Sequence, residues 1–291
     1  MKEINIFCFG FGQVAKNFIN KLMAEDIKVN LSVTSREKTN NKKYKDLEYK
    51  SYNFTENTFD QELLIDLKKA EYILVSIAPV NGIDIVVKNF QNVIDNFNTK
   101  WITYLSATSV YGNHNGEWVN EDSKTLPTSQ NGIDRLNAEK AWLNLANRKN
   151  LPLQTFRLSG VYSNQYNVLT RLKSGEAKII SKKNHFFSRI HVEDIANILF
   201  ISLSKLKKNE IFNISDDKPA SSEEITLYGV KLLNILKPKT IDADLLENGM
   251  LKNFYKDSKK ISNKKMKFFF NYKLKYPTYV EGLSYIYNNI I

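Results

Sequence analysis

The chain contains 291 residues, and 42% of them are hydrophobic, which is enough to bury a substantial core in one large α/β domain or two interlocked ones. Its net charge of +11 comes from scattered lysines, whereas arginine is scarce and unclustered, so we expect a solvated basic surface and no nucleic-acid partner. No apolar segment approaches the length needed to cross a membrane, so we expect no membrane-spanning part.

Cysteine usage favours a reducing compartment. The single cysteine, Cys8, permits no internal disulfide and lies in an apolar segment, which is typical of a buried small side chain. Strand-like sequence begins almost at the first residue, so we expect no signal peptide. Together these features predict a cytoplasmic protein.

The first predicted elements are a strand, a glycine-rich turn and a helix. Residues 4–9 are too apolar for a one-sided strand and fit a strand buried on both faces of a parallel sheet. Two glycines follow, and apolar residues then return at helical spacing, so the free N–H groups at the helix start point toward the turn. A dinucleotide pyrophosphate fits such a helix start. The alternative is a purely structural turn. The residues that we assign to this site are Gly10, Gly12, Gln13, Val14 and Ala15.

The following sequence alternates between the two kinds of element. We predict strands at residues 29–34, 49–54, 72–77, 101–105 and 153–158, and helices at 59–69, 83–97 and 133–148. Polar loops are expected at 36–47 and at 106–129, and the second is long enough to be functional. This alternation is typical of a doubly wound parallel sheet.

Beyond Gly160 the alternation changes. We predict a helix at 164–173, short strands at 178–181 and 186–190, a helix at 192–206, a last strand at 211–214 and two helical regions within 221–291. We therefore expect a cofactor domain at 1–160, completed by about 186–215. The remaining segments, 161–185 and 216–291, are expected to form a smaller lobe on the substrate side.

The end of the second strand indicates which dinucleotide binds. NAD sites place an acidic residue there for the ribose hydroxyls, whereas this chain has Thr34, Ser35 and Arg36. An arginine can give two parallel hydrogen bonds to a phosphate, so we predict NADP(H) in preference to NAD(H). An ordinary solvated loop arginine is the alternative. We also assign Ala78 and Pro79, at the end of a later strand, to the cofactor site.

Six motifs occur in an order that resembles a known superfamily. They are FGFGQVA at 9–15, YLSATSVYG at 104–112, AEKAWL at 138–143, FRLSGVY at 156–162, RIHVEDIA at 189–196 and FNISDDKP at 212–219. This set resembles the extended short-chain dehydrogenase/reductase superfamily, the NAD-dependent epimerase/dehydratase type. The resemblance implies a Rossmann-type fold with a smaller C-terminal lobe, a pyridine-nucleotide cofactor and oxidoreductase chemistry.

The resemblance also implies a catalytic tyrosine, a lysine four residues later and a serine or threonine. At those positions this chain carries Asn131, Arg135 and Ala107. Arginine can still donate to the nicotinamide ribose, but its pKa is too high for proton exchange at neutral pH. The chain therefore resembles an atypical branch that lacks the active-site tyrosine, and residues 259–283 resemble that branch's C-terminus.

The long predicted loop at 106–129 contains side chains that could replace the missing catalytic groups. Tyr111 is the best candidate acid, although a tyrosine that packs the loop is the alternative, and Thr108 and His114 are weaker candidates. The resemblance places Arg189 and His191 at the edge of the substrate pocket, where Arg189 can hold an anion. We predict no metal site. The substrate-pocket candidates are Ala107, Thr108, Tyr111, Asn131, Arg189 and His191.

Two hypotheses follow from the sequence. The first is an NADP(H)-binding oxidoreductase-like protein of the epimerase, dehydratase or reductase type, which acts on an unidentified small molecule with an altered catalytic set. The second is a non-catalytic protein that senses NADP(H) and regulates a partner. Related folds commonly dimerise through two helices, so a homodimer is possible.

Overall fold

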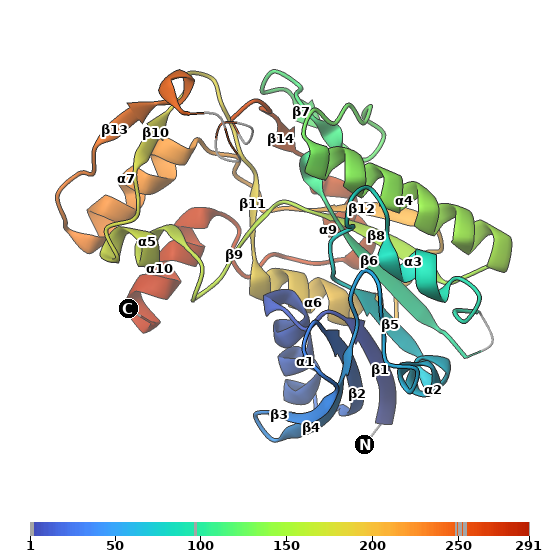
Figure 1. Cartoon of the computed structure of the whole chain (residues 1–291). Helices are drawn as coiled ribbons and strands as arrows, with labels where there is room; N and C mark the ends of the chain where they lie inside the picture. The colour runs from blue at the N-terminus through green and yellow to red at the C-terminus, as the bar shows by residue number, and fades with distance from the viewer. Residues whose placement is uncertain (1–2, 96–97, 248, 250–251, 253–254, 291) are drawn as a thin grey trace. The chain divides into compact units, whose positions relative to one another are not determined.

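A mostly parallel sheet of eight strands contains most of the predicted strands (Figure 1). The computed structural model describes residues 3–95, 98–247, 249, 252 and 255–290. The strands of this sheet, in spatial order, are β12 (Glu210–Ile214), β8 (Leu153–Leu158), β6 (Trp101–Ala107), β5 (Tyr72–Val75), β1 (Glu3–Phe9), β2 (Lys28–Ser35), β4 (Leu47–Asn53) and β3 (Asn40–Tyr44).

The strand order reverses direction between β1 and β5, as the doubly wound prediction requires. Strand β1 pairs in parallel with β2 on one side and with β5 on the other, which explains why its residues are apolar on both faces. The sheet is accompanied by α1 (Gln13–Ala24), α2 (Leu63–Lys69), α3 (Ile85–Phe90), α4 (Gln130–Lys149) and α6 (Val192–Ser202). The predicted Rossmann-type α/β fold is therefore confirmed.

Large aromatic side chains fill the core on one face of this sheet. Phe9, Phe54 and Phe90 are buried and lie within 6 Å of one another, measured between ring centroids. Helix α3 begins nearby because Asp84 accepts hydrogen bonds from the first N–H groups of the helix through Oδ1. Its Oδ2 accepts a bond of 3.0 Å from Trp142 Nε1, which ties α4 to the same core.

The chain divides into two compact units. The first contains residues 1–106, 134–156 and 195–212, and the second contains 107–133, 157–194 and 213–291. Short parallel pairs of strands occur in the second unit: β9 (Gly160–Tyr162) with β11 (Arg189–His191), β10 (Ile179–Ser181) with β13 (Thr240–Asp242), and β7 (Trp118–Val119) with β14 (Lys260–Ile261). Its helical elements are η1 (Thr108–Tyr111), α5 (Val168–Lys173), α7 (Ser222–Leu233), η2 (Ala243–Leu245), α9 (Lys264–Phe270) and α10 (Tyr279–Asn289).

Several element predictions were wrong. The loop predicted at 36–47 contains β3, an antiparallel edge strand whose sequence NNKKY carries no apolar alternation. The helix predicted from Phe59 begins at Leu63, because Phe59 instead forms a bridge with Phe54. The helix predicted at 83–97 is α3 alone, and residues 96 and 97 lie outside the described residues. In the described part of 221–291 there are three α-helices, where two helical regions were predicted.

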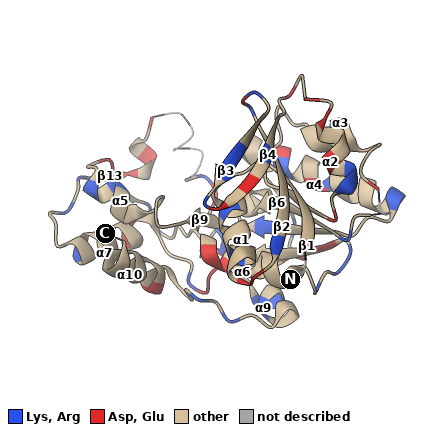
Figure 2. Cartoon of the chain, turned by 90° about the horizontal axis from the view of Figure 1, so that it is seen from below, with Lys and Arg blue, Asp and Glu red and all other residues tan. Residues whose placement is uncertain are grey.

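Charged residues of both signs are distributed over the chain. Figure 2 shows lysine and arginine on many elements, with acidic residues interspersed among them. Within the described residues, no helix is both long and apolar enough to span a membrane.

The aromatic core provides a test of the packing. Phe90→Ala removes a fully buried ring and should lower the free energy of unfolding by about 3–5 kcal/mol. As the control, Ile65→Ala on α2 alters a side chain that is 56% exposed, so its effect should stay within about 0.5 kcal/mol. Urea unfolding followed by circular dichroism measures both. Equal losses for the two variants would show that this core is packed differently.

Candidate functional site

The turn after β1 has a backbone that only glycine adopts easily. Gly10 has φ +89°, and an added Cβ would lie 2.8 Å from Ile77 Cγ2 and 2.9 Å from Ser76 Oγ. The Gly10 N–H donates to Thr34 Oγ1 at 3.0 Å, and the Ser76 hydroxyl donates to the carbonyls of Phe9 and Gly10. The turn is therefore held from β2 and from the segment after β5.

Open space lies in front of the first turn of α1. Gly12 is the N-cap residue, makes no side-chain cap, and has no atom within 4 Å of an added Cβ. No acidic residue lies in the first turn of the helix. The first N–H groups of an α-helix have no partner within the helix and carry partial positive charge, so they attract an anion. This geometry suits a pyrophosphate at Gly12, Gln13, Val14 and Ala15.

The three residues at the end of β2 differ in their surroundings: Thr34 and Ser35 use their hydroxyls in hydrogen bonds within the protein, whereas the Arg36 side chain is exposed. Thr34 is buried against Gly10, and Ser35 Oγ accepts hydrogen bonds from Ser51 Oγ and from the Glu37 N–H. The Arg36 side chain is exposed to solvent. Of these three residues, Arg36 is therefore the one whose side chain is available for a 2′-phosphate. Ala78 and Pro79 lie in the irregular segment between β5 and α3, and both are at least partly exposed.

An aromatic group beside the turn was not predicted from the sequence. The Phe11 ring lies 5.4 Å from Tyr44 and 5.1 Å from Tyr49, and Lys16 Nζ lies over Phe11 at 5.9 Å. Asn20 on α1 donates to the Tyr44 hydroxyl at 3.0 Å. The β3–β4 hairpin thus packs against the turn and α1. Because β3 has no apolar alternation, the sequence gave no signal for this contact.

Arg135 is anchored to the end of β6. Its Nη1 donates to the Leu105 carbonyl at 2.7 Å and to the Tyr104 hydroxyl at 3.3 Å. Burial raises the pKa of Tyr104, so this phenol is a poor proton donor. One residue along, the Ser106 hydroxyl donates to Glu139 Oε1 at 2.5 Å. Both contacts join β6 to α4 within the first unit.

Tyr111 and His114 are both engaged within the second unit. Tyr111 is fully buried, and its hydroxyl donates to Asn213 Oδ1 at 2.7 Å, while the Arg157 guanidinium lies 4.8 Å from its ring centroid. Burial raises the pKa of Tyr111. His114 Nε2 lies 3.1 Å from two backbone carbonyl oxygens, which only an N–H can bond. These contacts favour packing roles for both, and their catalytic roles stay predictions.

The other loop candidates differ in exposure. Ala107 and Thr108 are partly exposed at the start of η1, and Asn131 is exposed near the start of α4. The loop itself is attached to the C-terminal segment: Lys259 Nζ donates to the Gly112 carbonyl at 2.9 Å, and the Ser258 carbonyl accepts from the N–H groups of His114 and Gly116. The C-terminal segment thus fixes the head of the predicted functional loop.

Arg189 and His191 lie on β11 in different surroundings. Arg189 Nη1 donates to the carbonyls of Phe187 and Ala220, and burial lowers its pKa to about 10 although Asp216 opposes this. His191 is fully buried against the Tyr162 and Tyr276 rings, and burial lowers its pKa to about 4. His191 is therefore neutral at pH 7 and packed.

A cavity of about 880 Å³ in the second unit is lined by Arg189. Of the other predicted substrate residues, none lines it. Its lining includes three basic side chains and four tyrosines, which come from segments far apart in the sequence: Arg171, Lys178, Arg189, Tyr162, Tyr166, Tyr255 and Tyr279. The sequence offered no spacing from which these tyrosines could be grouped.

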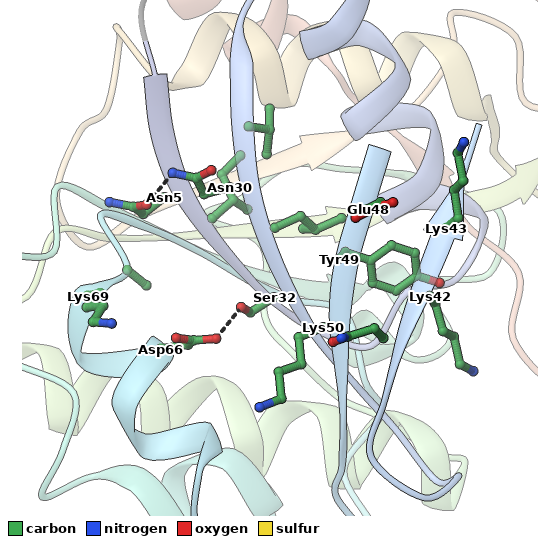
Figure 3. A pocket seen from close by; sticks show the side chains of 15 residues that line it. Asn5, Asn30, Ser32, Lys42, Lys43, Glu48, Tyr49, Lys50, Asp66 and Lys69 are labelled. Atoms are coloured by element: carbon green, nitrogen blue, oxygen red, sulfur yellow. Dashed lines mark hydrogen bonds between the residues drawn. The ribbon is translucent and has the colours of Figure 1, made fainter. Parts of the chain in front are cut away.

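Another hollow, of about 790 Å³, lies over the sheet in the first unit (Figure 3). Its polar side chains already bond one another: Asn30 donates to Asn5, and Ser32 donates to Asp66 at 2.8 Å. These residues lie toward the beginnings of β1 and β2, whereas the glycine-rich turn follows the end of β1. We therefore assign this hollow to sheet surface that the seven-residue helix α2 leaves uncovered.

The predicted site residues divide cleanly between the units. All predicted cofactor residues belong to the first unit, and all predicted catalytic and substrate residues belong to the second. The described residues contain no group of three or more histidine, cysteine or acidic side chains arranged to hold a metal ion.

Comparison with known proteins identifies the family of this chain. Residues 10–215 match the model of the NAD dependent epimerase/dehydratase family. The chain belongs to this family. The match begins at Gly10, in the turn that precedes α1, and ends just after β12. Residues that complete the cavity of the second unit, such as Tyr255 and Tyr279, lie beyond the match.

Several solved structures share the fold over nearly the whole chain. A conserved protein of unknown function from Silicibacter pomeroyi is 28% identical, with a TM-score of 0.84 and 99% of each chain covered. MoeE5 in complex with UDP-glucose and NAD is 18% identical and has a TM-score of 0.75. The alignment covers 98% of this chain and 97% of that chain. UDP-glucuronic acid 4-epimerase from Bacillus cereus in complex with NAD is 14% identical and has a TM-score of 0.76. The alignment covers 99% of this chain and 98% of that chain. No curated protein matches the sequence.

The two glycines of the family's turn should respond differently to substitution. Gly10→Ala meets both a left-handed backbone and close contacts, so it should lower the free energy of unfolding by about 1–3 kcal/mol. Gly12→Ala meets no atom and should change stability by less than about 1 kcal/mol. If pyrophosphate fills that space, however, Gly12→Ala should weaken dinucleotide binding at least tenfold. Calorimetric titration with NADPH measures this affinity, and unchanged NADPH binding in Gly12→Ala would contradict the predicted pyrophosphate site.

His191 should make stability depend on pH. Its folded pKa of about 4 lies below the usual 6.5, so between these values the unfolded chain binds a proton that the folded chain does not. Stability is therefore lost as pH falls from 6.5 toward 4. Between pH 7 and 4.5 the wild type should lose about 2–3 kcal/mol relative to His191→Gln. Urea unfolding at the two pH values tests this, with His114→Gln as the control; parallel losses in wild type and His191→Gln would refute it.

Proposed function

We propose that this family member is an NADP(H)-dependent oxidoreductase of the epimerase, dehydratase or reductase type, which acts on an anionic small molecule. The observation that carries the proposal is the open, uncapped start of α1 beside Gly12, combined with the exposed Arg36 at the end of β2. The first feature suits a pyrophosphate, and the second supplies a cation where a 2′-phosphate would lie.

The substrate is proposed to bind in the cavity of the second unit. Arg189 is partly buried there, with two hydrogen bonds from Nη1 to backbone carbonyls that fix its guanidinium. Arg171 and Lys178 add positive charge, so three basic side chains face one carboxylate, that of Glu176, in the described lining. An anionic substrate balances these charges, and the tyrosines offer faces for a ring. A volume of about 880 Å³ suits a molecule of sugar-nucleotide size. Neighbouring structures hold UDP-glucose, which supports this substrate class.

The chain's own residues limit the mechanism. A bound nicotinamide supplies or accepts the hydride. Within the described residues the structure gives no hydrogen bond to Arg135 Nε or Nη2, so these atoms can donate to a ribose hydroxyl. Tyr111 would have to give up its bond to Asn213 before it transferred a proton. Thr108 is partly exposed but does not line the proposed cavity, so it could orient only a part of the substrate that extends beyond the cavity.

The occupied hydroxyl of Tyr111 also favours the second hypothesis, in which the protein binds NADP(H) without turnover. One experiment separates the two. Purified protein is titrated with NADPH and NADP⁺, and then assayed for hydride transfer or epimerisation on a panel of sugar nucleotides and simple carbonyl compounds. Turnover supports the enzyme, and tight NADPH binding without turnover supports the sensor. Turnover that is unchanged in Tyr111→Phe removes Tyr111 as the acid.

The preference for NADP(H) is tested at Arg36. Loss of its guanidinium removes two hydrogen bonds to a 2′-phosphate that NADH lacks, so Arg36→Ala should weaken NADPH at least tenfold and NADH less than threefold. Arg148→Ala, on an exposed arginine of α4, is the matched control and should change neither. Equal losses of NADPH and NADH affinity in Arg36→Ala would overturn the assignment.

A further inference from the structure

A third hollow, of about 1070 Å³, lies beside β7, β14 and α9 in the second unit. It shares no lining residue with the proposed substrate cavity. The described residues that border it include three aromatic side chains, three lysines and two adjacent carboxylates: Trp118, Phe268, Tyr272, Lys264, Lys267, Lys273, Asp216 and Asp217.

Two of the three aromatic side chains at this hollow are exposed, and Tyr272 is partly buried. Phe268 is 90% exposed and Trp118 is 56% exposed. Helix α9 packs into the unit through Met266 and Phe270, which are buried, so its own packing does not use Phe268. Strand β7 holds Trp118 through its pairing with β14. Large aromatic residues that flank a hollow on the surface are typical of protein-binding sites, where they anchor a partner.

The charge around the aromatic pair is positive. Lys267 is paired with Asp217 at 2.9 Å, and Asp217 also accepts from Asn263 Nδ2, so this carboxylate is already neutralised. Lys264 and Lys273 are exposed, and the structure gives neither of them a hydrogen-bond or ion-pair partner among its described residues. An incoming acidic group would therefore meet two unpaired ammonium groups.

We propose that this hollow docks an acidic segment of a partner protein, with an apolar side chain against Trp118 and Phe268 and carboxylates on Lys264 and Lys273. The net charge of +11 opposes a second copy of this chain as the occupant. Single-stranded nucleic acid also uses aromatic and basic groups, but it needs a basic groove that follows its backbone, whereas only two unpaired lysines and no arginine border the hollow among the described residues, which favours a peptide. The proposal does not depend on the reaction proposed above.

Selection from a random 12-residue phage-displayed peptide library on the full-length immobilised protein tests this directly. Enriched peptides should be net acidic, carry an aromatic or large aliphatic residue, and bind more weakly as salt rises. Synthetic copies, measured by fluorescence anisotropy, should lose at least tenfold in affinity with Phe268→Ser or Trp118→Ser. The double variant Lys264→Gln/Lys273→Gln should lose about threefold to tenfold.

Leu236→Ser is the matched control, because Leu236 is 94% exposed in the same unit but does not border the hollow, and it should leave peptide affinity unchanged. Phe268 is exposed, so its variant should keep the unfolding curve of the wild type. Failure to enrich acidic peptides, or equal binding to Phe268→Ser, would overturn the proposal. So would dimerisation that Phe268→Ser abolishes in sedimentation, or binding of a 12-residue oligo(dT) that depends on Phe268.

Discussion

The constraint on which the first unit depends is the close approach of the Gly10 backbone to the segment after β5. A side chain at this position would collide with Ile77 and Ser76, and the Gly10 N–H is used by Thr34. The turn is thus fixed from both neighbouring strands before any ligand arrives. Because it is fixed, the start of α1 and its unpaired N–H groups are preorganised for an anion, and ordering the turn costs little on binding.

A comparable constraint fixes the long loop of the second unit. Gly112 has φ +69°, and a Cβ there would lie 1.7 Å from the Leu126 carbonyl oxygen, so the two ends of the loop are in direct contact. Lys259 bonds the Gly112 carbonyl, and burial lowers the pKa of this lysine. The loop is therefore tied to a segment almost 150 residues away in the chain. Such contacts convert a loop with little regular structure into a defined surface.

Two residues for which the sequence predicts a functional role, Arg135 and Tyr111, have defined hydrogen-bond partners. Arg135 is tied to the end of β6, and Tyr111 is buried with its hydroxyl on Asn213. Neither arrangement resembles a tyrosine whose proton is made mobile by an adjacent ammonium group. Arg189, in contrast, is partly buried in the second unit, where it lines a cavity rich in tyrosine.

The sequence by itself determined the parallel sheet and the glycine-rich turn, because strands buried on both faces and glycines at a tight turn leave local patterns. It also showed Arg36 in place of an acidic residue at the end of the second strand. Only the tertiary structure decided which polar side chains already have hydrogen-bond partners within the protein. The bond between Tyr111 and Asn213 joins residues 102 positions apart, and β3 formed without apolar alternation because β4 pairs with it. The tyrosine-lined cavity likewise comes from distant segments, and no local pattern encodes which side chains meet there.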